Sequence, residues 1–202
     1  MEPDLVAARR DDRAMEYTKY PVRDAKPRDG GVRNVVEWVA IVVGAFAVAL
    51  VVKTFLIQAF YIPSESMFPA LTEDDRVLVN KLSYELHAVH RGDLVVFERP
   101  PNEPDSAVKD LIKRVVALEG ETISERDGRL YIDDELLDEP YLEPGLESRN
   151  LQRMVIPPGH VFVMGDNRGS SRDSRFFGPI SEDLIIGRAF VKVWPLPDVE
   201  LL

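Results

Sequence analysis

The sequence predicts a mainly β domain that follows one N-terminal membrane-spanning helix. Three observations support this fold class. One apolar run of membrane length lies near the N-terminus, short β-branched runs separated by Pro and Gly follow it, and apolar residues make up 45% of the 202 positions, which is enough for a packed core. We expect a tail over residues 1–34, a transmembrane helix over residues 35–57 and the β-rich domain over residues 58–202.

The membrane-spanning helix is predicted from a run without charged or strongly polar side chains, residues 38–52. With its apolar flanks the run reaches about 20 residues, enough to cross a hydrocarbon core of roughly 30 Å. A buried core helix normally keeps a polar stripe, whereas residues 39–52 are apolar all round. A cleaved leader would have a short basic start and a small-residue exit, whereas 34 residues precede this run and Lys53-Thr54-Phe55 is no such exit. We therefore expect a retained anchor.

The tail carries the charges that orient this anchor. It contains Gly30-Gly31 and shows no sustained apolar periodicity, which is typical of a mobile terminus. Beyond Lys53, at the outer end of the run, the next basic residue is Arg76. The basic residues close to the run on its N-terminal side are Lys19, Arg23, Lys26, Arg28 and Arg33. The positive-inside rule therefore predicts a single-pass protein of the cell membrane, with a cytoplasmic tail and residues 58–202 on the extracytoplasmic face.

Charge and composition exclude several classes of function. Residues 58–202 hold 16 Lys and Arg against 27 Asp and Glu, a net charge of −11, which argues against a nucleic-acid partner. The chain has no cysteine, so thiol catalysis, disulfides and Cys-based zinc sites are excluded. His87 and His90 are three residues apart, but no further ligand lies at a recognised metal spacing. We interpret them as surface histidines.

The domain after the anchor reads as short strands. Asp133-Asp134 between two short runs predicts a two-residue hairpin turn, and this hairpin belongs to a short insertion over residues 118–160. Residues 98–108 are polar and Pro-rich, which predicts a loop. The expected strands are residues 76–80, 93–97, 111–117, 130–132, 135–137, 161–164 and 186–194.

Two serines lie on a stiffened segment directly after the anchor. Ser64 and Ser66 stand between Pro63 and Pro69, and each proline pushes its preceding residue, Ile62 or Phe68, toward extended geometry. A hydroxyl with so little freedom suits a nucleophile. A serine-rich turn leaving a helix would produce the same pattern.

A serine nucleophile needs a base, and Lys113 has the most suitable setting. It lies in an otherwise apolar predicted strand, on the same face as Leu111 and Val115. Lysine acts as a base only where burial favours its neutral form. The alternative is a solvent-facing lysine that protects an edge strand.

The last dense cluster of polar residues is 165–175, which follows a hydrophobic strand. Asp166, Asn167 and Asp173 do not match the ligand spacing of a calcium loop. A loop joined by Asp–Arg pairs, supporting a site formed elsewhere, is the most economical interpretation.

Together these stretches resemble bacterial type I signal peptidase, the membrane-bound serine/lysine leader peptidase family. The resemblance covers about residues 35–195, with the motifs in family order behind the anchor. The matching segments are residues 63–69 (PSESMFP), 91–97 (RGDLVVF), 112–116 (IKRVV), 165–168 (GDNR) and 171–175 (SRDSR). The sequence departs from the family pattern at residues 117–121 (ALEGE) and at Gly169-Ser170. These departures affect loops and not the Ser–Lys pair.

The resemblance implies a role for each matching residue. Ser66 resembles the nucleophile and Lys113 the general base, while Ser64 and the Ser66 N–H would form the oxyanion hole. Ser171 would orient the lysine amine. The residues that would support the loop are Asp166, Arg168, Asp173 and Arg175. Those that would line shallow pockets for small substrate residues are Phe60, Ile62, Met67, Leu71 and Ile112.

The resemblance thus implies a signal-peptidase-like β-rich catalytic domain that cleaves signal peptides from exported preproteins. Its partners would be these preproteins, the lipid bilayer and nearby export machinery, with no metal or cofactor. Self-cleaving repressors also use Ser and Lys, but they carry a DNA-binding domain and no membrane anchor. A non-catalytic, membrane-anchored β domain that binds export clients would need only the strands.

Overall fold

Helix α1 spans Gly30–Val51 in a computed structural model that describes residues 30–52, 56–103 and 108–202. Its segment Gly31–Val51 is long and apolar enough to cross a membrane. Every side chain from residue 31 to 52 is exposed, and an apolar helix without a polar face is stable only when other apolar matter covers it.

Helix α1 begins and ends earlier in the chain than the transmembrane helix predicted over residues 35–57. Residues Gly30 and Gly31, assigned to the tail, are helical, and Ile57 begins a strand. Apolarity alone sets the predicted limits, whereas the helix also includes the polar residues Arg33 and Asn34. The basic residues predicted to orient the anchor from positions 19–28, and the segment Lys53-Thr54-Phe55, lie outside the described residues.

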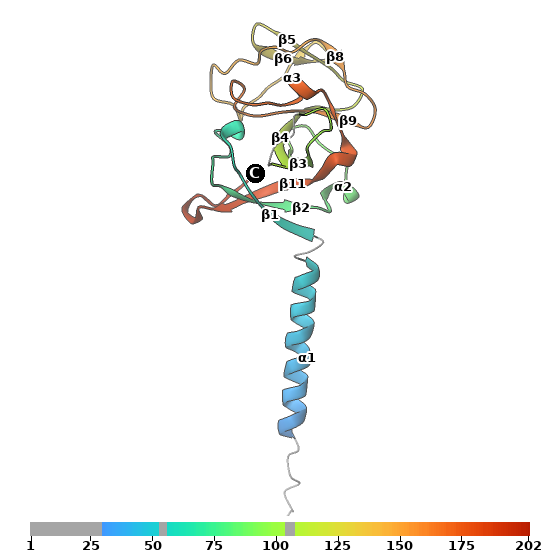
Figure 1. Ribbon diagram of the computed structural model, residues 1–202, viewed down its shortest axis with the longest axis vertical. Coiled ribbons are helices and arrows are strands. Elements are labelled where there is room, and N and C mark those ends of the chain that lie inside the picture. Colours follow the sequence, from blue (N-terminus) through green and yellow to red (C-terminus); the bar gives the residue numbers. More distant parts are fainter. Residues whose placement is uncertain (1–29, 53–55, 104–107) are drawn as a thin grey trace, which may run out of the picture. The chain divides into compact units, whose positions relative to one another are not determined.

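The β domain is organised on one antiparallel sheet (Figure 1). Among the described residues this sheet has eight strands in the order β1-β2-β11-β3-β4-β9-β10, with β12 paired to β11. The long strand β11 shows register shifts against both β2 and β3, as expected of β-bulges, which bend a strand. The strands are β1 (Ile57–Tyr61), β2 (Arg76–Asn80), β3 (Leu94–Glu98), β4 (Asp110–Ala117), β9 (His160–Met164), β10 (Ile180–Ser181), β11 (Ile185–Trp194) and β12 (Glu200–Leu201).

The insertion forms a second, four-stranded antiparallel sheet in the order β7-β6-β5-β8. The predicted hairpin is confirmed, because Ile132 pairs with Glu135 across the two-residue turn. Asp133 and Asp134 have φ values of 49° and 69°, the left-handed conformation that a type I′ turn requires. The strands are β5 (Thr122–Arg126), β6 (Arg129–Ile132), β7 (Glu135–Leu136) and β8 (Met154–Val155).

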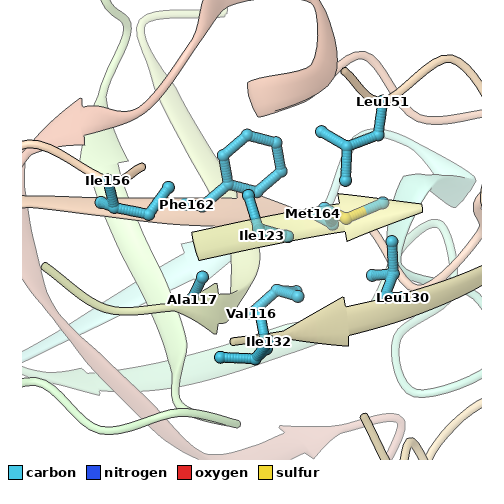
Figure 2. Close-up of a cluster of buried hydrophobic side chains, with 9 residues drawn as sticks. All are labelled: Val116, Ala117, Ile123, Leu130, Ile132, Leu151, Ile156, Phe162 and Met164. Carbon is cyan, nitrogen blue, oxygen red and sulfur yellow. The ribbon is translucent and has the colours of Figure 1, made fainter. Parts of the chain in front are cut away.

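A shared hydrophobic cluster joins the insertion to the main sheet. Figure 2 shows its nine buried side chains, which come from strands β4, β5, β6 and β9 and from the segment before β8 and the residue after it. Burial of apolar surface is stabilising at about 25 cal/mol per Å², so this cluster attaches the insertion to the main sheet. Its members are Val116, Ala117, Ile123, Leu130, Ile132, Leu151, Ile156, Phe162 and Met164.

The fold class predicted from the sequence is confirmed: the chain has one long apolar helix followed in the sequence by a mainly β domain with a hairpin-bearing insertion. Strands β1, β5, β8, β10 and β12 were not predicted. The helical turns were missed as well, because three or four residues are too few to show a helical period. They are η2 (Glu65–Met67), α2 (Ser83–Leu86), α3 (Ser174–Phe177), η3 (Glu182–Leu184) and η4 (Leu196–Asp198).

Candidate active site

Ser66 lies on the short helical turn η2, which follows β1 through Pro63. The segment before it is fixed by two backbone hydrogen bonds between Ile62 and the residues just before β2, Ile62 N to Asp75 O at 2.9 Å and Asp74 N to Ile62 O at 3.0 Å. Behind Ser66, Met67 is fully buried and anchors the turn in the core. The Ser66 hydroxyl is therefore held on a rigid support at the surface of the main sheet.

Lys113 approaches Ser66 from the middle of strand β4. Its Nζ lies 2.7 Å from Ser66 Oγ and 2.8 Å from the carbonyl oxygen of Ile112. The residue is 4% exposed, so the interpretation of Lys113 as a solvent-facing edge residue is wrong. The fold thus brings together a hydroxyl and an amine that are 47 residues apart in the chain.

Burial determines the acid–base character of this lysine. Loss of solvent lowers the pKa of Lys113 to about 8, and the nearby carboxylates of Asp173 and Asp166 oppose this by favouring the charged form. A substantial fraction of the amine is therefore neutral slightly above neutral pH, which ordinary lysine does not achieve. The 2.7 Å distance to Ser66 Oγ is within the range for direct proton transfer.

Two further serines lie beside this pair. Ser64 Oγ is 3.3 Å from Ser66 Oγ, so the two hydroxyl groups lie side by side. Ser171, predicted to orient the lysine amine, is buried. Its Oγ has no hydrogen-bond partner among the described residues, and the contacts of Lys113 go to Ser66 and Ile112 instead. The orienting role of Ser171 therefore stays a prediction.

A tight turn at Gly165 packs against the backbone of Ser66. A Cβ on Gly165 would lie 2.2 Å from Ser171 Oγ and 2.4 Å from the Ser66 carbonyl oxygen, so only glycine fits. Asn167 bonds to the same segment, since its N donates to Ser66 O at 3.1 Å and its Nδ2 to Glu65 O at 3.2 Å. Residues 165–167, the Gly165 turn, thus hold the nucleophile from behind.

Of the four residues predicted to support the loop, two pair with each other within it and two find charged partners outside it. Asp173 pairs with Arg175 through two contacts of 2.8 Å and also accepts a hydrogen bond from Gly165 N at 3.1 Å. Asp166 does not pair with a residue of its own loop. It receives Arg114 of β4, at 2.9 and 2.6 Å.

Arg168 reaches the insertion rather than a carboxylate of its own loop. Its side chain is fully buried, and its Nη1 and Nη2 contact Glu139 at 3.2 and 2.5 Å. It also donates to Ser148 Oγ through Nη1 and to Gly165 O through Nε, the latter at 3.1 Å. Glu139 and Ser148 were not predicted as part of the site.

A narrow cleft of about 50 Å³ opens beside Ser66 and Lys113. Two strand edges border it, because within the described residues β1 pairs only with β2, and the first half of β4 pairs only with β3. The backbone groups of Lys109 and Val115 form hydrogen bonds on the β3 side of the strand. Because backbone groups along a strand point alternately to its two sides, those of Asp110 and Ile112 point toward the cleft. The lining residues are Phe60, Tyr61, Ile62, Pro63, Ser64, Ser66, Val96, Val108, Asp110, Leu111, Ile112 and Lys113.

Three of the five predicted pocket residues, Phe60, Ile62 and Ile112, line this cleft. The prediction for Met67 and Leu71 needs correction. Both are fully buried in the cluster that also contains Ile62, and neither is among the lining residues. Their side chains support the floor of the cleft from within the core.

Comparison with known proteins identifies the family. A model of the family described as signal peptidase, peptidase S26, matches residues 35–194. The chain belongs to this signal peptidase family. It is therefore a serine peptidase, a hydrolase of peptide bonds.

Two signal peptidases resemble the chain over most of its length, and one solved structure resembles it over half. A probable signal peptidase I-1 from Synechocystis is 40% identical over 79% of this chain and 82% of its own length. Signal peptidase IB from Staphylococcus aureus is 32% identical over 82% of this chain and 93% of its own length. A signal peptidase I of known structure from Enterococcus faecalis is 29% identical, covers 50% of this chain and 97% of its own, and gives a TM-score of 0.41.

Sequence reasoning on the signal peptidase motifs missed the partners that hold the Gly165 turn. Arg114 follows Lys113 directly, and these two are the only charged residues in the otherwise apolar stretch 111–117 of β4. This pattern was a signal that Arg114, like Lys113, has a partner inside the protein. Glu139 and Ser148 lie in an irregular segment without periodicity. Nothing in their sequence pattern separates them from surface residues.

Proposed function

We propose that this chain is a signal peptidase I in which Ser66 and Lys113 form the catalytic dyad that cleaves signal peptides from exported preproteins. The observation that supports the dyad is the 2.7 Å contact between a buried Lys113 amine and the Ser66 hydroxyl. A serine alone is a weak nucleophile and needs an adjacent base. Lys113 is the one basic group in contact with Ser66 Oγ among the described residues.

The reaction follows from this geometry. Neutral Lys113 accepts the proton of Ser66 Oγ as the oxygen attacks the scissile carbonyl, and the resulting oxyanion is stabilised by the Ser66 N–H and the Ser64 hydroxyl. Protonated Lys113 then gives its proton to the leaving amine, the new N-terminus of the mature protein. Water, deprotonated by Lys113, resolves the acyl-enzyme and releases the signal peptide with a free carboxylate.

The substrate binds as an extended strand between the two edges of the cleft. Asp110 and Ile112 offer backbone groups for β-augmentation from one side, and the edge of β1 faces the cleft from the other. A cleft of about 50 Å³ accepts small side chains such as that of alanine. This geometry supports cleavage after small residues.

The membrane placement is part of the proposal. Helix α1 anchors the chain in the lipid bilayer of the cell membrane, with the tail of residues 1–34 in the cytoplasm and the catalytic domain, residues 58–202, on the extracytoplasmic face, near the export machinery. Ser66 follows Val52 by only 14 residues, which keeps the site near the membrane where a signal peptide ends. Protease added to sealed, right-side-out cells should digest residues 58–202. Protection of this domain would exclude the orientation.

The dyad is tested with purified full-length chain in detergent and a preprotein substrate. Ser66→Ala and Lys113→Met should abolish cleavage, because each removes one member of the proton-transfer pair. Matched controls are Ser170→Ala and Lys109→Met, whose side chains are exposed on the neighbouring loop and strand end, and these should cleave at the rate of the unmodified chain.

An acylating serine-protease probe separates catalysis from binding alone. It should label the unmodified chain at Ser66 and leave Ser66→Ala unlabelled. Full cleavage by Ser66→Ala, or no labelling of the unmodified chain, would show that the dyad assignment is wrong.

A further inference from the structure

We propose that Glu139, in the insertion, is a positioning residue for the Ser66–Lys113 pair, acting through Arg168 and the Gly165 turn. The inference rests on the proposed function of that pair. It assigns the insertion a part in catalysis rather than only in the stability of the fold.

The first step is the contact between Glu139 and Arg168. Both guanidinium Nη atoms reach the carboxylate, at 3.2 and 2.5 Å, a two-point geometry that fixes orientation as well as charge. The Arg168 side chain is fully buried, and that of Glu139 is 12% exposed. Because a buried guanidinium without a counter-charge is strongly unfavourable, Glu139 determines where Arg168 lies.

The second step is the contact between Arg168 and the Gly165 turn. Arg168 Nε donates to the carbonyl oxygen of Gly165 at 3.1 Å. The N–H of the same glycine is held by Asp173 at 3.1 Å. The peptide groups on both sides of Gly165 are therefore fixed by charged side chains, one of which depends on the insertion.

The third step is the contact between the Gly165 turn and the nucleophile. The turn donates two hydrogen bonds to the backbone at Glu65 and Ser66, and it leaves no space for a Cβ at Gly165. Movement of the turn therefore moves Ser66 relative to Lys113, or opens a gap behind it. Displacements of about 1 Å in a catalytic group cost on the order of 10²-fold in rate.

Tyr141 strengthens the same connection from a neighbouring position. Its hydroxyl donates to Glu139 Oε1 at 2.9 Å. Its ring lies 4.1 Å below the guanidinium of Arg114, within cation–π distance, and Arg114 holds Asp166 of the turn. The segment Glu139–Tyr141 thus contacts both arginines that fix the turn.

This role is separable from the attachment of the insertion, which the nine-residue hydrophobic cluster supplies (Figure 2). None of the residues in that cluster belongs to the Glu139–Arg168 contact. Loss of the carboxylate charge should leave the insertion folded and attached, while Arg168 and the Gly165 turn lose their fixed position.

The test compares Glu139→Gln with Asp134→Asn in the full-length chain. Both variants change a carboxylate to an amide within the insertion. Asp134 pairs with Arg126 and Arg153 at the exposed hairpin, and asparagine tolerates its positive φ. We expect Glu139→Gln to lower kcat by about tenfold to hundredfold while KM for a preprotein peptide stays the same, and Asp134→Asn to keep both constants.

The pH profile of cleavage separates positioning from a loss of folded protein. A displaced turn admits water to Lys113, which relieves the burial that is the largest cause of its lowered pKa. The acidic limb of kcat in Glu139→Gln should therefore shift to higher pH. Movement of Asp166 and Asp173 away from the amine would act in the opposite direction, but these carboxylates contribute less than burial. A loss of folded protein lowers the rate by the same factor at every pH and leaves the limb in place.

The inference is overturned if Glu139→Gln cleaves at a rate within twofold of the unmodified chain. It is also overturned if the rate falls while the acidic limb of the pH profile stays in place. If Glu139→Gln does not fold, Tyr141→Phe provides the same test, because it removes only the hydrogen bond to Glu139 and should also shift the limb. Ser66→Ala in parallel keeps the two proposals apart: an inactive Ser66→Ala beside an unaffected Glu139→Gln refutes only the role of Glu139.

Discussion

Replacement of Gly165 by alanine tests whether the turn behind Ser66 controls catalysis. An added Cβ would lie 2.2 Å from Ser171 Oγ and 2.4 Å from Ser66 O, and ordinary contact begins at 3.4 Å. The turn and Ser66 must therefore separate by about 1 Å. A misplacement of this size costs on the order of 10²-fold in rate, and overpacking of the site should lower the free energy of unfolding by about 1–3 kcal/mol.

The assay is the cleavage of a preprotein by Gly165→Ala in detergent, with thermal unfolding measured on the same sample. Gly169→Ala is the matched control, since nothing lies within 4 Å of an added Cβ at this position of the same loop. It should cleave at the rate of the unmodified chain. If Gly165→Ala also keeps its full rate, the turn does not position Ser66 and the reasoning is refuted.

Two further predictions concern stability. The pKa of Lys113 falls from 10.5 to about 8 on folding because of burial. Between these pH values the unfolded chain therefore binds more protons, and the free energy of unfolding rises with pH. Below pH 8, burial of the charged amine lowers the free energy of unfolding by its full amount, about 3 kcal/mol. Lys113→Met should therefore raise the melting temperature at pH 7 and lose this advantage above pH 10.5. An unchanged or lower melting temperature at pH 7 would contradict the claim that burial of the charged amine destabilises the fold. Leu71→Ala should lower the free energy of unfolding by about 2–5 kcal/mol, because the side chain is fully buried. A normal melting curve together with altered preference at the cleavage site would instead place Leu71 in the substrate pocket.

The strands of the main sheet were predictable because their signals are local. β2 was predicted with its observed limits, and β3, β4, β9 and β11 within one or two residues. Alternation and β-branched residues mark such strands without reference to the rest of the chain. The hairpin turn at Asp133-Asp134 was predictable for the same reason.

Strand β1 was missed because the apolar pattern of the anchor continues into it. Ile57 satisfies both a membrane span and a strand, and only its pairing with Asn80 decides between them. The predicted anchor extends beyond the C-terminal end of helix α1 for the same reason. Sequence periodicity does not record the partner that a strand will find.

Within the candidate site, the sequence indicated Ser66 and Lys113 as the proposed dyad, whereas the contacts that support them could not be predicted. Ser66 and Lys113 were identified from rigid or apolar surroundings and from motifs. Arg168 was predicted to support its own loop, but its counter-ion is Glu139, 29 residues away on the insertion. Long-range ion pairs depend on how the sheets pack, and a carboxylate in an irregular segment carries no local mark of its partner.

The pH dependence of kcat/KM for preprotein cleavage by the full-length chain tests the central claim most directly. Neutral Lys113 must accept the Ser66 proton, so activity should rise with pH along a limb near the lowered pKa of about 8 and level off above it. A limb near 6.5, the ordinary value for histidine, or one near 10.4, the value for a solvated lysine, would show that a buried Lys113 is not the base.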